Sequence, residues 1–225
     1  MPQTRRAGER SEGHAETGLK TMRGATEFGT GGYYELVIDL GSHDERLTRA
    51  VDALWSHADL ATAEGVAANE NLAAEGAARH PAWRHGVARL PNGARIPCRS
   101  FAEVIAGPSG EKAYVVFALP MAALERACAA DRPVAANAAH AAHATSGGLD
   151  TAWRERLENW LAELGAHVDA AVPFGAAYIG FLPFPIGEEE LAESLFAREV
   201  PAERYLAYLY RWEDDLRYFP TNRWS

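Results

Sequence analysis

The sequence predicts an α+β fold in which helices pack largely on one face of a mainly antiparallel sheet. Segments with a strand pattern are each followed by a helical pattern near residues 33, 113 and 177. A hairpin signal lies between the first two units, and a long amphipathic helix precedes the third. The uneven spacing excludes a solenoid of fixed period. Two related ferredoxin-like lobes are compatible with this order, and an α/β fold with a parallel sheet is the alternative.

The first unit covers residues 33–57. Its apolar side chains alternate with the period of a half-buried strand, at Tyr34, Leu36, Ile38 and Leu40. Gly41 interrupts the strand. Ser42 and Glu45 then have the spacing of a capping box, which predicts that a helix begins here.

The later units are shorter. An apolar strand pattern runs from Lys112 to Phe117, and Pro120 suits the first position of a following helix. The third strand begins at Ala177, and residues 188–196 follow as a helix with acidic residues in its first turn. Residues 86–99 predict a hairpin whose turn contains Asn92-Gly93.

One long helix is expected after Asp150, a plausible N-cap. Its apolar stripe consists of Trp153, Leu157, Trp160, Leu161, Leu164 and Val168. The C-terminal stretch 201–220 fits a helix by spacing, but its density of aromatic residues favours a hairpin that turns at Glu213-Asp214-Asp215. Both alternatives stay open at this point.

Composition divides the chain into four parts. Residues 1–32 have few large apolar side chains and are expected to form a disordered tail. Residues 33–130 form a first α+β lobe, 131–149 an alanine-rich connector, and 150–225 a second α+β lobe packed on the first. The sequence predicts no oligomeric state.

The chain is acidic: its 225 residues include 22 Lys and Arg against 31 Asp and Glu, a net charge of −9. Removing the five basic and four acidic residues of the tail leaves 17 basic and 27 acidic ones. This balance argues against nucleic-acid binding, which needs clustered basic residues. There is no signal-peptide pattern and no apolar run long enough to span a bilayer. With only two cysteines, the expected location is the cytoplasm.

Candidate catalytic groups are incomplete. His140 and His143 would share one face of a helix, and a third metal ligand could come from His80, His85, His167 or Asp150. No carboxylate sits beside the pair at a recognised spacing, so the pattern is not specific for a metal site. Cys98 has no cysteine-hydrolase signature around it, and Ser109 lies in a plain turn rather than a nucleophile elbow. The sequence therefore favours a noncatalytic protein with no metal and no cofactor. A metal- or cysteine-dependent hydrolase and a small-ligand site between the lobes are the alternatives.

Aromatic and charged residues gather near the C-terminus, a composition typical of an interface. We expect the binding residues to be Trp212, Asp214, Asp215 and Arg217. The acidic charge would speed encounter with a basic protein. The sequence thus predicts a cytosolic binding or regulatory module that engages a protein partner, with a basic protein as the candidate.

Overall fold

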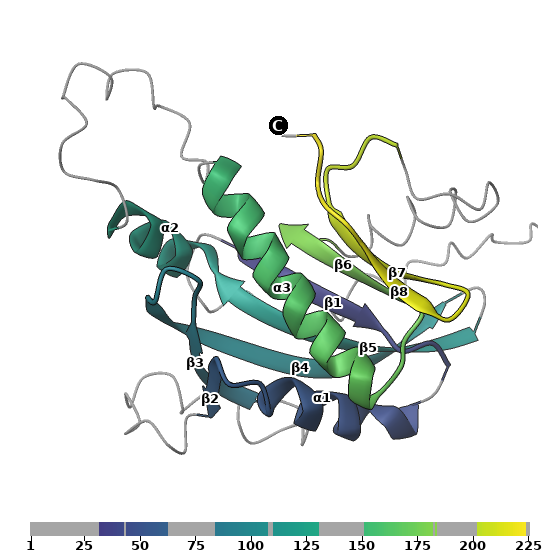
Figure 1. The fold of residues 1–225 in the computed structure, drawn as a ribbon. Coiled ribbons are helices and arrows are strands. Elements are labelled where there is room, and N and C mark those ends of the chain that lie inside the picture. Colours follow the sequence, from purple (N-terminus) through teal and green to yellow (C-terminus); the bar gives the residue numbers. More distant parts are fainter. Residues whose placement is uncertain are drawn as a thin grey trace, which may run out of the picture.

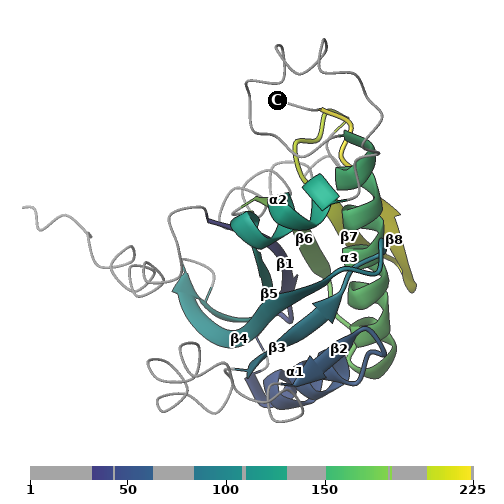
Figure 2. The same cartoon turned by 90° about the vertical axis from the view of Figure 1, so that its left-hand side faces the viewer.

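The computed structural model describes residues 32–42, 44–62, 84–107, 110–130, 151–181, 183 and 202–223. They form one eight-stranded sheet in the order β2-β3-β4-β5-β1-β6-β7-β8, with every neighbouring pair antiparallel. The three described helices lie on one face of it (Figures 1 and 2). The α+β prediction is confirmed, and the parallel alternative is wrong.

The strands are β1 (Tyr33–Asp39), β2 (Leu60–Thr62), β3 (Arg84–Arg89), β4 (Arg95–Gly107), β5 (Gly110–Pro120), β6 (Ala176–Phe181), β7 (Ala207–Trp212) and β8 (Asp215–Phe219). The helices are α1 (Leu47–Trp55), α2 (Met121–Ala130) and α3 (Thr151–Ala171). None of these helices is long and apolar enough to cross a membrane.

The centre of the sheet has the order of a single βαββαβ unit. This unit consists of β1, α1, β4, β5, α3 and β6, with β2 and β3 inserted after α1 and α2 inserted after β5, and in the sheet its strands lie β6-β1-β5-β4. Strand β1 pairs with β5 on one side and β6 on the other, so strands of both expected lobes share one sheet. The structure does not show two related ferredoxin-like lobes, and the division at residues 131–149 stays a prediction.

The main core lies between the helices and the sheet. The alternating side chains of β1 on this face are buried, as the strand pattern predicts. All six residues of the predicted stripe on α3 are buried as well. A Cβ atom on Gly165 would lie 2.3 Å from Leu209 Cδ1, so glycine lets α3 approach β7 closely. The long helix and the first strand are therefore confirmed as core elements.

Local predictions had mixed outcomes. The β3–β4 hairpin turns at Asn92-Gly93, where Gly93 has a φ of 82° and Asn92 Oδ1 accepts the Ala94 N–H. The capping box is wrong, because a 3₁₀ turn at Asp44–Arg46 precedes α1 and its N-cap is Arg46, without a side-chain cap. The Arg46 guanidinium instead donates to the carbonyls of Leu40 and Pro173. The helix predicted at 188–196 lies outside the described residues.

The opposite face of the sheet carries a second, aromatic cluster. Its buried members are Val37, Tyr114, Val116, Ala176, Tyr178, Leu206 and Tyr208. Beside it, Glu35 and Arg99 are buried on either side of Ala118, with which both are in register. The Arg99 guanidinium lies 4.0 Å from the centre of the Tyr33 ring. Burial raises the pKa of Glu35 to about 7, although the positive charge of Arg99 opposes that rise.

Candidate functional site

The C-terminal stretch is a hairpin, which settles the alternative left open by its sequence. Strands β7 and β8 pair from Tyr208 with Phe219 to Trp212 with Asp215, and the turn is Glu213-Asp214. Glu213 has a φ of 55°, the left-handed region that two-residue hairpin turns require. The aromatic residues from Tyr208 to Phe219 thus belong to strands rather than to a helix.

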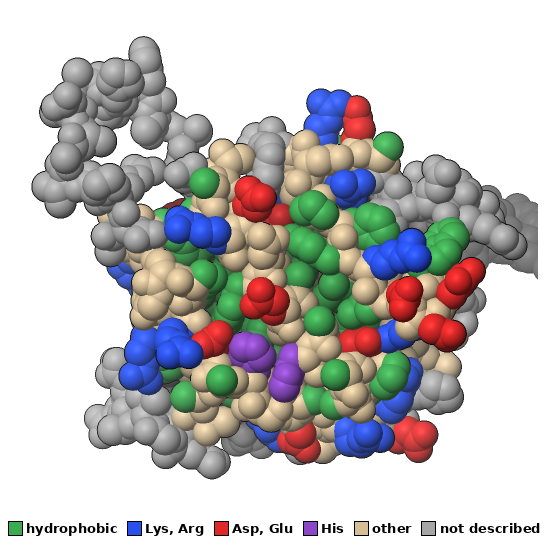
Figure 3. Space-filling view, viewed as in Figure 1, with side chains coloured by type: hydrophobic (Ala, Val, Ile, Leu, Met, Phe, Trp, Pro, Cys, Tyr) green, Lys and Arg blue, Asp and Glu red, His purple; other side chains and the backbone are tan. Residues whose placement is uncertain are grey.

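The structure brings the four expected binding residues together on this hairpin. Trp212 ends β7 and is half-buried, and its ring packs against that of Tyr210 at 6.4 Å between centres. Asp214 and Asp215 are exposed at the turn, and Arg217 is exposed opposite Tyr210. Figure 3 shows acidic side chains gathered at the right-hand end of the molecule, where the β7–β8 turn lies.

Arg211 fixes this turn to the rest of the fold. Its guanidinium binds both carboxylate oxygens of Asp169 on α3 and donates to the Phe174 carbonyl at 3.0 Å. It also donates to the carbonyl of Asp214 at 2.8 Å, inside the turn. Sequence reasoning missed Arg211, because its partner on α3 lies 42 positions away. The acidic turn is therefore held in a defined place.

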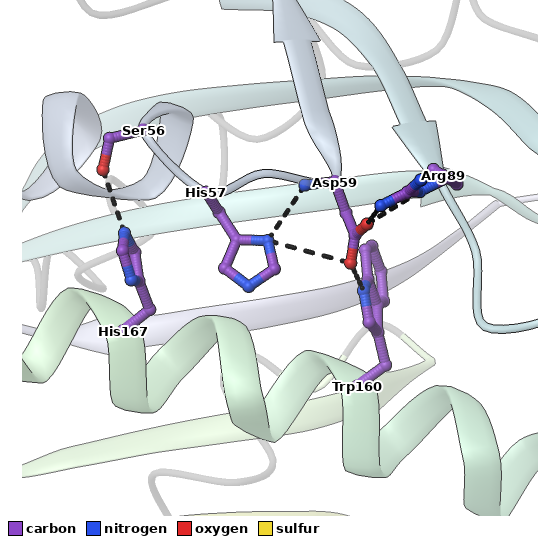
Figure 4. Close-up of polar contacts among 6 residues, drawn as sticks. All are labelled: Ser56, His57, Asp59, Arg89, Trp160 and His167. Carbon is purple, nitrogen blue, oxygen red and sulfur yellow. Dashed lines mark hydrogen bonds and ion pairs between the residues drawn. The ribbon is translucent and has the colours of Figure 1, made fainter.

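A second polar cluster lies where α1 ends against α3 (Figure 4). Asp59 accepts two hydrogen bonds from Arg89, at 2.9 and 2.7 Å, and one from the Trp160 indole N–H at 3.1 Å. The backbone N–H of Asp59 donates to His57 Nδ1 at 3.3 Å. The ring of His167 meets that of His57 edge to face, with centres 5.2 Å apart.

The serine of this cluster is a poor nucleophile. Ser56 Oγ lies 2.9 Å from His167 Nε2, the spacing of a nucleophile and its base. The same hydroxyl donates its one proton to the Ala53 carbonyl at 2.7 Å, so His167 must act as the donor to Oγ. Ser56 is also the C-cap of α1, where carbonyl oxygens would repel an oxyanion. This geometry does not support acyl transfer.

His57 should make stability depend on pH. Its Nδ1 accepts a hydrogen bond and must be unprotonated, and burial lowers its pKa below 6.5, with His167 lowering it further against the opposing charges of Asp59 and Glu163. The folded state then binds fewer protons than the unfolded state, so stability falls as pH falls below about 6.5. We expect His57→Gln to reduce this loss in urea titrations between pH 5 and 7.5. Ser56→Ala, which keeps both rings, is the control, and an unchanged slope in His57→Gln would contradict this role.

A third polar cluster is buried between α3, β1 and the C-terminal segment. Glu158 is 1% exposed, and its Oε1 accepts hydrogen bonds from the Tyr34 hydroxyl at 2.5 Å, Arg154 Nε at 3.0 Å and the Thr221 hydroxyl at 3.0 Å. Among the described residues, its Oε2 and the buried hydroxyl of Tyr218 have no hydrogen-bond partner. Three donors on one oxygen and none on the other leave the carboxylate able to accept another hydrogen bond.

The other candidate residues lend no support to catalysis. Cys98 is buried on β4, and burial raises the pKa of its thiol to about 12, which leaves it protonated at neutral pH. His140, His143 and Ser109 lie outside the described residues. Within the described ranges, no three His, Cys, Asp or Glu side chains could hold a metal ion.

Comparisons with known proteins identify no relative. No protein-family model, no curated protein and no solved structure matches this chain. A function can therefore be inferred only from the geometry of the described residues.

Proposed function

We propose that this protein is a noncatalytic binding or regulatory module of the cytoplasm, and that the β7–β8 hairpin contacts a protein partner. The observation that carries the proposal is the exposed acidic turn, residues 213–215, held against α3 by Arg211. A positioned turn loses less conformational entropy on binding than a loose one. The half-buried rings of Tyr210 and Trp212 add apolar area beside the charges.

The expected partner is basic. The chain has a net charge of −9, and the exposed Glu213, Asp214 and Asp215 concentrate part of it at one end of the sheet. Opposite charges speed diffusional encounter more than they strengthen the final complex. The inert thiol of Cys98 supports a noncatalytic role, and so does the hydrogen bond in which His167 Nε2 acts as donor, not acceptor, toward Ser56 Oγ.

Reversing the charge of the turn should slow association. We expect Asp214→Lys with Asp215→Lys to lower the on-rate for lysine-rich peptides about tenfold at low salt, with a smaller effect at high salt because salt screens exposed charges. The measurement is surface plasmon resonance with lysine-rich peptides and glutamate-rich peptides of equal length.

A matched variant separates the hairpin from net charge. Glu111→Lys with Glu125→Lys changes the net charge equally, at exposed positions on β5 and α2. It should retain most of the on-rate. Equal slowing in both variants, or no slowing in the hairpin variant, would reject the hairpin as the contact surface.

A further inference from the structure

In the part of the chain that the structure describes, no strand pairs with the outer side of β8. The strand lies at the end of the sheet, and Arg211 is paired with Leu216. The Arg211 N–H donates to the Gly175 carbonyl, away from β8. In an antiparallel sheet, a residue directs both its backbone N–H and its C=O toward the same neighbouring strand. Since Arg211 directs these groups toward β6, it makes no backbone hydrogen bonds with Leu216. The backbone groups of Leu216, and by the alternation along a strand those of Tyr218, point outward.

These outward groups have no backbone partner among the described residues. The side chains of Leu216 and Tyr218 pack toward α3, against the main core. Arg217 and Phe219 lie on the other face, where Arg217 is exposed. An unpaired edge of this kind is a template for an added strand.

Acidic groups follow the α3 side of this edge. Glu155 is exposed on α3, and Glu158 is buried there in an ion pair with Arg154, with no partner for its Oε2 among the described residues. Burial raises the pKa of Tyr218, and the negative charges of Glu158 and Glu155 raise it further. The acidic turn 213–215 lies at the start of β8. Exposed carboxylates thus lie at the turn that begins this edge and on α3, the helix toward which Leu216 and Tyr218 pack.

We propose that β8 accepts an extended basic segment of the partner as a ninth, antiparallel strand, with its basic side chains on the α3 side. This inference rests on the proposed function and specifies how the partner binds. Residues directly opposite Leu216 and Tyr218 would place their side chains on the α3 side, beside Glu155. The alternate residues would face Arg217 and Phe219, where an apolar side chain fits better than a basic one.

A second copy of this chain fits the edge less well. Each copy carries a net charge of −9 and the same acidic turn, so pairing of two β8 strands would bring like charges together. A segment that alternates basic and apolar residues meets complementary charge on one face and Phe219 on the other.

N-methylated peptides test the strand pairing directly. The probe is a blocked, fluorescent peptide of four Lys-Val repeats, and its affinity is measured by anisotropy. In the proposed pairing the lysine N–H groups point to β8, so N-methylation of the lysines should lower affinity at least about fivefold. N-methylation of the valines, whose N–H groups point away, should leave the affinity within about twofold.

A substitution in the protein provides the second arm. Leu216→Pro removes an outward N–H that β7 does not use, and sheets tolerate proline at such edge positions. It should weaken binding at least about fivefold, whereas Leu216→Ala, which keeps the N–H, should not. The N-methylated peptides bind to the wild-type protein, so they test the strand pairing even if the Leu216→Pro variant does not fold.

The outcomes separate this inference from the proposed function. If the charge-reversed turn slows association but neither lysine methylation nor Leu216→Pro weakens binding, the acidic hairpin is the contact surface and strand addition is wrong. If none of these changes has an effect, both proposals fail. A dimer in sedimentation that Leu216→Pro abolishes would make a second copy the occupant and overturn the basic segment.

Discussion

Trp160→Ala is expected to lower the free energy of unfolding by about 3–5 kcal/mol, the range for removing a large aromatic side chain from a core. Trp160 is 5% exposed, and its ring meets that of Phe117 edge to face at 6.2 Å between centres. Its indole N–H also donates to Asp59, which joins the α1–β2 connection to α3. Urea titration at pH 7 measures the change.

Trp160→Phe distinguishes packing from hydrogen bonding. This variant keeps an aromatic ring in the core but cannot donate to Asp59, so we expect a loss of about 1–2 kcal/mol. A loss below about 1 kcal/mol in Trp160→Ala would mean that the stripe on α3 is not core. Equal losses in both variants would assign the effect to the indole N–H instead of the packing.

Glu35→Gln is expected to remove a pH-dependent loss of stability of about 3 kcal/mol. The folded pKa of Glu35 is about 7, against 4.5 for the free side chain. Between these values the folded state binds more protons than the unfolded state, so the free energy of unfolding decreases as pH rises. Each pKa unit corresponds to about 1.4 kcal/mol. The stabilising contribution is fully present below about pH 4.5 and is lost as pH rises through about 7.

The comparison of wild type with Glu35→Gln isolates this group. Other titrating groups, including His57 with its opposite trend, contribute equally to both proteins and cancel in the difference. Urea titrations from pH 4.5 to 8 should show the variant gaining stability over wild type as pH rises. Parallel pH profiles would show that the pKa of Glu35 is not raised, and that solvent reaches the second face of the sheet at this position.

Local patterns predicted the elements that depend on neighbours in sequence. The alternation on β1, the stripe on α3 and Asn92-Gly93 are each read within a few residues, and the structure confirms all three. The β4–β5 hairpin was missed, although Gly107 and Gly110 pair at its closed end, where the sequence indicated only a turn. No element was predicted for residues 100–107, which the structure places in β4.

For the site, too, local patterns in the sequence led to predictions, whereas contacts between distant residues were missed. Trp212 and Asp214 of the hairpin were selected because clustered aromatic and charged residues are typical of interfaces. Their role in binding stays a prediction. Arg211 with Asp169, and Tyr34 with Glu158, join side chains 42 and 124 positions apart. Such pairs form only when strand register and helix placement bring distant residues together. No local pattern in the sequence indicates which distant residues these are.

The central place of β1 in the sheet has a consequence for how the chain folds. Val37 has its sheet partners in Val116 and Tyr178, both far along the chain, while β7 and β8 need only a two-residue turn. Pairing across long separations is slow, because loop closure must precede the contacts that repay it. During synthesis β1 leaves the ribosome well before β5 and β6, so the backbone groups at both of its edges have no strand to pair with until these strands emerge. Until β5 emerges, β1 therefore lacks the neighbour that pairs with all seven of its residues.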